Sequence, residues 1–317
     1  MPGSSEHDYT HGYANAAVAE MASRTAESHA GFFLPYLRGL GDHARVLDCG
    51  SGPGSISIGF AQRLPGGMVK GIDIDAGQVK IARELADSAA VTNVEFQQAN
   101  LHEIPFGDET FDAVFANAVL EHVSNPLGVL PEMFRVLTPG GIAALRHSNV
   151  SSRIWSPPAP PEVQRAEAMW IEQWRRNGGD PDFGAHQAGL MTTAGFEIIG
   201  TSDSAHHLDR DRLLHRTRLG GEAGFMTPLS DIGVPASDVP ATIKAFDEWL
   251  ADEKASNSMP MIETVGRKQV AGSGWPTPTF SRPKRRDLHR YEPLNPCRRA
   301  HLPLPDFPTG VEGPGAG

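Results

Sequence analysis

The sequence predicts an α/β fold with a doubly wound, mostly parallel sheet of seven strands, and two observations support this prediction. Short apolar runs typical of buried strands alternate with helical segments. The helical segments between strands are about ten residues or longer, and such connections join parallel strands in a sheet covered on both faces. The predicted strands are residues 45–48, 68–73, 94–98, 111–116, 141–147, 195–199 and 261–268.

Helical periodicity, with apolar residues three and four positions apart, predicts the remaining elements. Two alanine-rich helices precede the first strand, and a crossover helix joins the fourth and fifth strands. The predicted helices are residues 14–24, 26–37, 56–64, 76–88, 127–137, 162–177 and 238–254.

The chain divides into five predicted parts. An N-terminal helical cap (1–40) precedes the α/β core (41–202), and a mostly helical insertion (203–258) is expected to form a lid. The last core strand follows at 259–270. In the final segment, 271–317, prolines crowd together and no period survives, which predicts a disordered tail.

Composition narrows the functional classes. The net charge of -10 disfavours nucleic acid as a partner, because phosphates attract Lys and Arg. No apolar run is long enough to cross a bilayer, and the N-terminus lacks the features of a secretory signal. The two cysteines, Cys49 and Cys297, are far apart in sequence and form no disulfide framework. We therefore expect a cytoplasmic protein with no nucleic-acid partner and no membrane span. We expect it to be a monomer or homodimer.

A glycine cluster directly follows the first predicted strand, at the sheet edge where α/β folds bind ligands. Residues 48–54 read DCGSGPG, and glycine there allows tight turns and close approach to a ligand. A dinucleotide-binding loop would follow G-x-G-x-x-G, but Ser55 stands three residues after Gly52 and Gly54 comes one residue early. The Gly-Lys-Ser/Thr of a phosphate-binding loop is absent. The spacing therefore opposes both a nicotinamide site and a nucleoside triphosphate site.

A second polar cluster, GIDID at 71–75, ends the next predicted strand. A carboxylate at this position can accept hydrogen bonds from both hydroxyls of a ribose. A helix begins directly afterwards, so each aspartate also suits the role of helix N-cap. We assign the cap to Asp75 and the ligand contact to Asp73.

These blocks together resemble the class I S-adenosylmethionine-dependent methyltransferases, especially small-molecule enzymes similar to those of ubiquinone and menaquinone biosynthesis. The resemblance runs from Tyr9 to Lys268 and is sharpest from Arg45 to Arg146. Four blocks in a fixed order carry it: VLDCGSGPGS, GIDID, FQQANLHEIPFGDETFDAVFANAVLEHV and EMFRVLTPGG. It implies a Rossmann-like fold and S-adenosylmethionine as the cofactor.

The resemblance also implies which residues hold that cofactor. Asp73 would bind the ribose and Ile74 would lie against the adenine. Asn100 and Leu101 stand where the family usually has Asp followed by a small residue at the adenine edge, which is a departure, although an Asn carbonyl still accepts a hydrogen bond. The methionine part would be lined by Asp48, Gly50, Gly52 and Gly54, with Ala116 and Asn117 at its ammonium group.

Other candidates lie around this core. Tyr9 and Arg24 belong to the N-terminal cap; Arg24 suits the cofactor's carboxylate, or is a surface arginine on an amphipathic helix. His122 and His147 are candidates to contact substrate or to act as a base, with structural roles as the alternative. Trp155, Trp170 and Trp174 are candidates for a pocket wall, although tryptophans at helical spacing are more often core.

No metal site is predicted, because the histidines lack a ligand constellation. The sequence thus favours direct methyl transfer to an O, N or C atom of a small organic molecule. Two alternatives remain open at this point: an NAD(P)-dependent oxidoreductase, and a non-catalytic S-adenosylmethionine-binding protein.

Overall fold

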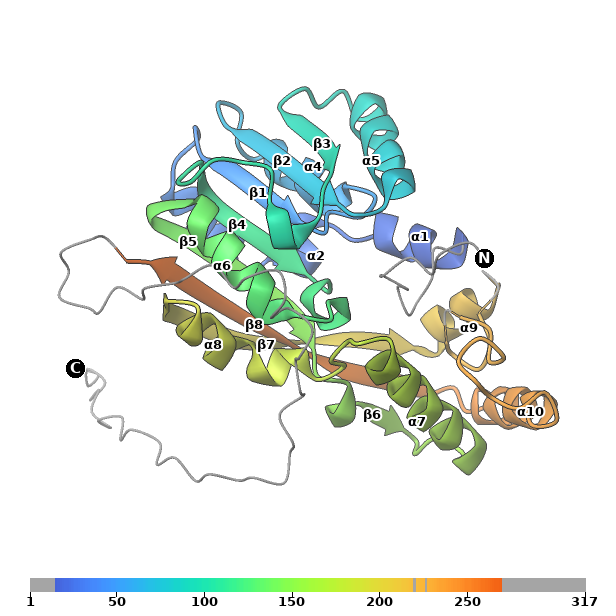
Figure 1. Ribbon diagram of the computed structural model, residues 1–317. Helices are drawn as coiled ribbons and strands as arrows, with labels where there is room; N and C mark the ends of the chain where they lie inside the picture. Colours follow the sequence, from blue (N-terminus) through green and yellow to red (C-terminus); the bar gives the residue numbers. More distant parts are fainter. Residues whose placement is uncertain (1–14, 219–220, 226, 270–317) are drawn as a thin grey trace, which may run out of the picture.

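A computed structural model of the chain describes residues 15–218, 221–225 and 227–269 (Figure 1). Its centre is one eight-stranded sheet in the order β3-β2-β1-β4-β5-β8, with β7 and β6 both hydrogen-bonded to β8. Strands β1 to β5 are parallel, whereas β8 is antiparallel to its partners. The strands are β1 Arg45–Cys49, β2 Met68–Asp73, β3 Val94–Gln98, β4 Phe111–Asn117, β5 Leu137–Ser148, β6 Ile154–Ser156, β7 Phe196–Asp209 and β8 Ser256–Lys268.

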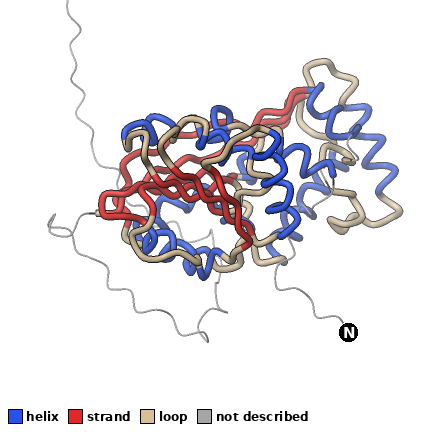
Figure 2. The backbone as a smooth tube through the Cα atoms, turned by 90° about the horizontal axis from the view of Figure 1, so that it is seen from above, coloured by secondary structure: helices blue, strands red, loops and turns tan. Residues whose placement is uncertain are grey.

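Helices cover both faces of this sheet, as the view from above shows (Figure 2). One core cluster packs α2 to α5 against one face, and a second packs α6 and α8 against the other. The doubly wound, mostly parallel fold is thereby confirmed. The helices are α1 Asn15–Ala22, α2 Ala26–Ala30, α3 Leu34–Gly39, α4 Ser55–Ala61, α5 Ala76–Ser88, α6 Pro126–Val136, α7 Pro161–Arg176, α8 Phe183–Thr193, α9 Arg210–Arg218 and α10 Val239–Trp249, with short 3-10 turns η1 Leu101–Glu103, η2 Leu120–His122 and η3 Val150–Ser152.

The strand count differs from the prediction by one. The extra strand, β6, has only three residues and pairs with the beginning of β8, Ser256–Ser258. The predicted helix at 26–37 is divided into α2 and α3. Pro35 occupies the first turn of α3, where its missing N–H leaves no hydrogen bond unmade, because the first N–H groups of a helix have no partner within it.

The predicted boundaries of the insertion at 203–258 also change. Residues 203–209 continue β7, and residues 256–258 already belong to β8. A third core cluster joins residues 150–174 to residues 208–255, with Trp174 and Phe246 among its buried side chains. The helical layer beside the sheet is therefore larger than predicted, because α7 belongs to it together with α9 and α10 (Figure 1). The strand β6 packs against this layer through Trp155.

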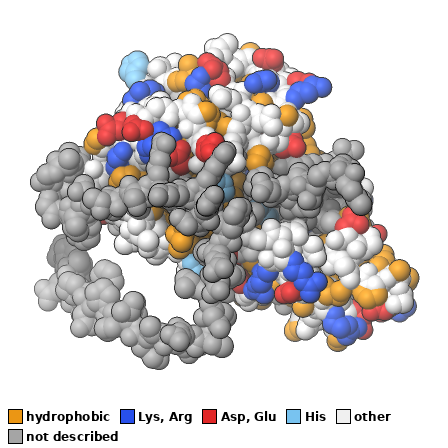
Figure 3. Space-filling model, in the orientation of Figure 1, with side chains coloured by type: hydrophobic (Ala, Val, Ile, Leu, Met, Phe, Trp, Pro, Cys, Tyr) orange, Lys and Arg blue, Asp and Glu red, His pale blue; other side chains and the backbone are white. Residues whose placement is uncertain are grey.

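The surface is of mixed charge. On the face drawn in Figure 3, basic and acidic side chains of the described residues lie interspersed. Over the described part of the chain, no helix is both long and apolar enough to pass through a bilayer. The predicted tail, 271–317, lies outside the described residues.

Candidate active site: two connected cavities at the carboxyl edge of the sheet

The strand order changes direction between β1 and β4, and a cavity of about 1230 Å³ lies at the carboxyl ends of these strands and of β2. This is the crevice where open α/β sheets bind ligands. We call it the cofactor cleft. It gathers nine of the predicted cofactor residues, namely Arg24, Asp48, Gly50, Gly52, Asp73, Ile74, Asn100, Leu101 and Asn117.

The glycine loop after β1 forms one wall of the cofactor cleft. The backbone N–H groups of Gly50 and Ser51 both donate to the carbonyl of Ile72, at 2.8 and 2.9 Å, which fastens the loop to β2. Gly50 and Gly52 have φ of +74° and +52°, a region that favours glycine. A Cβ on Gly50 would lie 2.4 Å from Val119, whereas one on Gly52 would meet no atom closer than 3.8 Å. Gly52 therefore leaves open the space that a ligand would fill.

Asp73 connects the two predicted binding segments. Its carboxylate accepts hydrogen bonds from the backbone N–H groups of Gly52, at 2.9 Å, and Asp75, at 3.0 Å. Burial raises its pKa, and these two hydrogen bonds oppose that rise. Asp75 instead caps α5 by accepting from Gln78 N–H at 2.8 Å, as predicted. The side chain assigned to the ligand thus also holds the glycine loop in place.

Asp48 lies below the loop and is 3% exposed. Burial raises the pKa of Asp48 to about 7, and the hydroxyl of Ser57, which donates to it at 2.5 Å, opposes the rise. Ile74 forms the outer rim and is 42% exposed, so it offers an apolar surface to a flat ring. Leu101 is buried beside it, while the side-chain oxygen of Asn100 caps η1 by accepting from His102 N–H at 2.9 Å.

Two predicted cofactor residues do not line the cleft. Ala116 is fully buried in the second core cluster, and its place in the wall is taken by Ala118, which has a φ of +52°. Gly54 is the N-cap residue of α4 and faces the interior. A Cβ there would lie 2.6 Å from the ring of Phe96 and 2.8 Å from Ala82, so this glycine permits helix packing and does not border the ligand space.

We expect Gly54→Ala to lower the free energy of unfolding by about 3 kcal/mol, since overpacking and a left-handed φ each cost roughly 1–3 kcal/mol. Urea denaturation measures this loss. Gly52→Ala is the matched control and should cost only about 1 kcal/mol, because its methyl group enters open space. Equal losses in the two variants would contradict this assignment.

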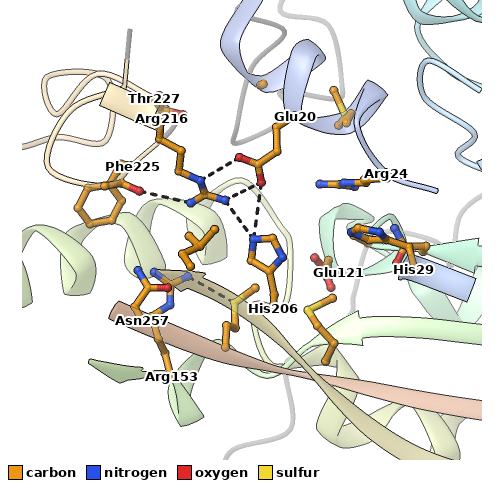
Figure 4. A pocket seen from close by; sticks show the side chains of 18 of the residues that line it. Glu20, Arg24, His29, Glu121, Arg153, His206, Arg216, Phe225, Thr227 and Asn257 are labelled. Atoms are coloured by element: carbon orange, nitrogen blue, oxygen red, sulfur yellow. Dashed lines mark hydrogen bonds and ion pairs between the residues drawn. The ribbon is translucent and has the colours of Figure 1, made fainter. Parts of the chain in front are cut away.

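A second cavity of about 970 Å³ adjoins the cofactor cleft, and we call it the inner pocket (Figure 4). The two cavities share one wall, formed by Met21, Arg24, Asn117, Ala118 and His122. The remaining wall residues of the inner pocket come from α1, α2, η2, β5, α7, β7, α9 and β8, and from the loops that hold Arg153 and Phe225. The two cavities therefore adjoin each other at these five residues.

The shared wall holds two predicted candidates. Arg24 follows α1, and its Nε is buried without a hydrogen-bond partner among the described residues. The imidazole of His122 stacks on Trp174, with ring centroids 4.5 Å apart, and its Nε2 lies 3.8 Å from a carboxyl oxygen of Glu121. Burial raises the pKa of Glu121 to about 7, and a hydrogen bond from Ser148 N–H at 2.7 Å opposes the rise.

His147 does not line either cavity, contrary to its prediction as a substrate contact. It is fully buried, and its Nε2 accepts a hydrogen bond from Leu120 N–H at 3.1 Å. Its Nδ1 bonds to the side-chain oxygen of Gln187 at 2.9 Å. Burial lowers the pKa of His147 to about 3. Both ring nitrogens are therefore engaged in the core, and we do not propose a catalytic role for His147.

Trp170 and Trp174 lie in the third core cluster and also line the inner pocket, so both of their predicted roles hold. Tyr9 lies outside the described residues. Among the residues that the structure describes, no group of three or more His, Cys, Asp or Glu side chains is placed to hold a metal ion.

The chemistry of the cofactor cleft fits an adenosyl amino acid. Three buried polar atoms in its walls have no hydrogen-bond partner within the described part of the chain: Arg24 Nε, Ser51 Oγ and Gln78 Oε1. Buried polar groups are normally satisfied, so these atoms indicate a polar ligand. The sequence did not predict Ser51 and Gln78 as binding residues. Neither belongs to a recognisable pattern, because serine and glutamine are common in loops and at the first turn of a helix.

Comparisons with known proteins agree with this geometry. The family model described as Methyltransferase domain matches residues 40–186. The protein named "Probable methyltransferase ltbC" from Aspergillus luteorubrus is 34% identical over 274 residues, covering 78% of this chain and 93% of that protein. The ubiquinone/menaquinone biosynthesis C-methyltransferase UbiE of Proteus mirabilis is 41% identical over 106 residues, or 32% of this chain and 42% of that enzyme.

The fold has solved counterparts as well. A crystal structure of a protein from Bacillus halodurans C-125 has a TM-score of 0.52 and 21% identity, and covers 75% of this chain and 99% of that one. The structure of the YcgJ protein of Bacillus subtilis has a TM-score of 0.50 and 20% identity. The match covers 77% of this chain and 100% of that one. At these identities the likeness concerns the fold. With a relative 34% identical over nearly its whole length, the chain belongs to the class I methyltransferases, the family that uses S-adenosylmethionine as its cofactor.

Proposed function

We propose that this chain binds S-adenosylmethionine in the cofactor cleft and transfers its methyl group to an O, N or C atom of a small organic molecule in the inner pocket. When bound, the cofactor would supply an electrophilic methyl group on a sulfonium. The observation that carries the proposal is the shared wall, because through it a nucleotide-type cleft directly adjoins a second pocket. A protein that only stored the cofactor would not need the second cavity.

Different residues of the cofactor cleft would bind different parts of the cofactor. Asp73 would accept the ribose hydroxyls while it keeps the glycine loop closed, and Ile74 would pack against the adenine. Arg24 would pair with the carboxylate through its unpartnered Nε, a charge-assisted hydrogen bond. Asn117, which accepts from Arg146 Nη1 at 3.1 Å, would border the amino end.

The inner pocket would orient the acceptor and exclude water. Positioning of two reactants can supply effective molarities of about 10⁵ M or more, so no further chemistry is required of the protein for an acceptor that is already nucleophilic. For a protonated acceptor, His122 is placed to take the proton, because it lies in the shared wall beside Glu121. The helices α1 and α9, which both line the pocket, would close it as a lid.

Label transfer tests this function. The protein is incubated with methyl-labelled S-adenosylmethionine and a panel of phenols, quinones, amines and organic acids, and labelled products are separated and counted. Transfer to at least one compound of the panel supports the proposal. Tight cofactor binding with no product from the panel or from cell extracts would favour a non-catalytic binding protein.

His122→Gln tests the proposed base once an acceptor is known. General bases contribute about 10²–10⁴-fold, so kcat at saturating cofactor should fall at least 100-fold for a protonated acceptor. Unchanged kcat would exclude this role. We do not expect His147→Gln to produce this fall in kcat, because His147 lies outside both cavities.

A further inference from the structure

The inner pocket holds an unusual concentration of arginine. Four guanidinium side chains from different parts of the chain line it: Arg24, Arg146, Arg153 and Arg216. Three of them, Arg24, Arg153 and Arg216, are labelled in Figure 4. The side chains of Arg146, Arg153 and Arg216 are 4%, 11% and 14% exposed, although arginine is rarely so buried. Like charges gathered in a poorly hydrated space repel one another, so the cluster requires compensation.

Carboxylates compensate three of these four charges. Arg216 pairs with Glu20 at 2.6 Å, Arg153 with Glu167 at 3.2 Å, and Arg146 with Glu263 at 3.5 Å, each distance joining nitrogen and oxygen.

The fourth, Arg24, lies near Glu121, whose pKa burial raises to about 7 and which is therefore only partly ionised at neutral pH. Without a bound cofactor, the inner pocket thus keeps positive charge in excess. A bound cofactor would pair its carboxylate with Arg24, so the unsatisfied donors, rather than this excess, indicate where an anion binds.

Two histidines of the pocket respond to that excess. Burial lowers the pKa of His29 to about 2, and the charge of Arg24 lowers it in the same direction. Burial likewise lowers the pKa of His206 to about 3, together with the charge of Arg216. Both imidazoles are neutral at physiological pH, so they add no charge, and a bound anion would relieve the repulsion among the guanidinium groups.

Unsatisfied donors locate the position of such an anion. Arg153 Nε and Asn257 Nδ2 are buried and have no hydrogen-bond partner among the described residues. Figure 4 shows the two side chains together, on the opposite side of the pocket from Arg24 and Glu121. Asn257 is 2% exposed, and both residues line the inner pocket. This end is therefore remote from the wall that the pocket shares with the cofactor cleft.

The rest of the wall is apolar. It consists largely of Trp170, Trp174, Leu208, Phe225, Met259 and Met261. Aromatic and thioether side chains accommodate flat or irregular hydrophobic bodies. Two remaining donors match the two oxygens of one carboxylate, whereas a phosphate group has three acceptor oxygens to satisfy.

We propose that the inner pocket binds an organic acid, whose carboxylate lies between Arg153 and Asn257, whose hydrophobic body lies on the tryptophans, and whose acceptor atom points to the shared wall. This inference rests on the proposed methyl transfer, because it assigns the substrate class of that same site. Methylation would accordingly occur at the end of the molecule remote from the anchored carboxylate.

Matched acids and amides test the proposal. The probes are 4-hydroxybenzoate, 4-hydroxyphenylacetate and 4-hydroxycinnamate, each paired with its primary amide, titrated calorimetrically into the full chain with and without S-adenosylhomocysteine. We expect at least one acid to bind at least 10-fold more tightly than its amide. Equal affinity within a pair, or no binding of any acid, would overturn the proposal.

Variants then locate the anchor. Arg153→Gln should weaken binding of the acid at least 10-fold and leave the amide within about 2-fold, since only the acid loses a charge-assisted contact. Asn257→Leu, which retains side-chain volume, should weaken the acid in the same direction and serves as the second variant if Arg153→Gln leaves Glu167 unpaired and fails to fold. Arg165→Gln, on the exposed face of α7, is the matched control and should change neither affinity.

The proposed function and the organic-acid proposal can be refuted separately. Absence of S-adenosylhomocysteine binding would refute the proposed function, while the preference for acid over amide, measured without it, still decides which class of ligand the inner pocket binds. Normal cofactor binding with no such preference, or with a preference that Arg153→Gln and Asn257→Leu leave intact, would refute only the organic-acid proposal.

Discussion

Replacement of Asp73 by alanine is expected to weaken binding of S-adenosylhomocysteine by about 100-fold or more. Hydrogen bonds to a charged group contribute roughly 1.5–3 kcal/mol each, and two ribose hydroxyls would lose their acceptor. The same substitution releases Gly52 N–H, which now donates to Asp73 at 2.9 Å, so the loop loses its support as well. Titration calorimetry of the wild type and the variant measures the change.

Asp75→Ala is the matched control for this substitution. Asp75 lies two residues away and caps α5, so its loss should cost about 1 kcal/mol of stability but change affinity by less than about 3-fold. An analogue without the 2′- and 3′-hydroxyls separates the two roles of Asp73. It should bind the wild type weakly and lose little further affinity in Asp73→Ala if the ribose contact dominates. An affinity of Asp73→Ala equal to that of the wild type would contradict the assignment.

The second large effect concerns the pH dependence of stability at Glu121. Burial raises the pKa of Glu121 to about 7 in the folded state, from an ordinary value of 4.5. At a pH between these two pKa values, the carboxyl of Glu121 is more often protonated in the folded protein than in the unfolded chain. The free energy of unfolding therefore falls as the pH rises through this range. The loss amounts to about 3 kcal/mol at pH 8, because each pKa unit corresponds to about 1.4 kcal/mol.

Glu121→Gln should remove this loss. Its amide oxygen can still accept from Ser148 N–H, but no charge needs to be buried. We therefore expect the variant and the wild type to be similarly stable at pH 4.5, and the variant to be more stable by about 3 kcal/mol at pH 8. Chemical denaturation at the two pH values measures both differences. A wild type that is the more stable protein at pH 8 would show that Glu121 is held as a carboxylate by its arginine neighbours.

The sequence predicted best those helices and strands whose ends and buried face are each marked by a clear local pattern of residues. Helix α5 coincides with the predicted 76–88, because a capping aspartate and a periodic apolar face define it. Helix α8 was not predicted, since its sequence, FGAHQAGLMTT, has no dominant apolar face. The far end of β7, residues 203–209, was assigned to the helical insertion because its polar residues lack the composition of a buried strand.

In the candidate site, too, the residues that a local pattern defines were predicted and the others were not. Asp73, Gly50 and Gly52 follow from local spacing, because strand ends and turns fix their positions. Gly54 and His147 adjoin the correct motifs but face the core, and a motif does not specify on which side of a loop or strand a side chain lies. Arg153, Arg216 and Asn257 meet only through tertiary packing of segments up to 104 residues apart (153 to 257), for which no local signal exists.

The most direct test of the central claim is a pair of calorimetric titrations of the unmodified protein, one with S-adenosylmethionine and one with NADH. We expect one S-adenosylmethionine to bind per chain, and NADH to give only heat of dilution, because the glycine spacing opposes a dinucleotide site. Binding of NADH without binding of S-adenosylmethionine, or indifference to both, would contradict the assignment of the cleft.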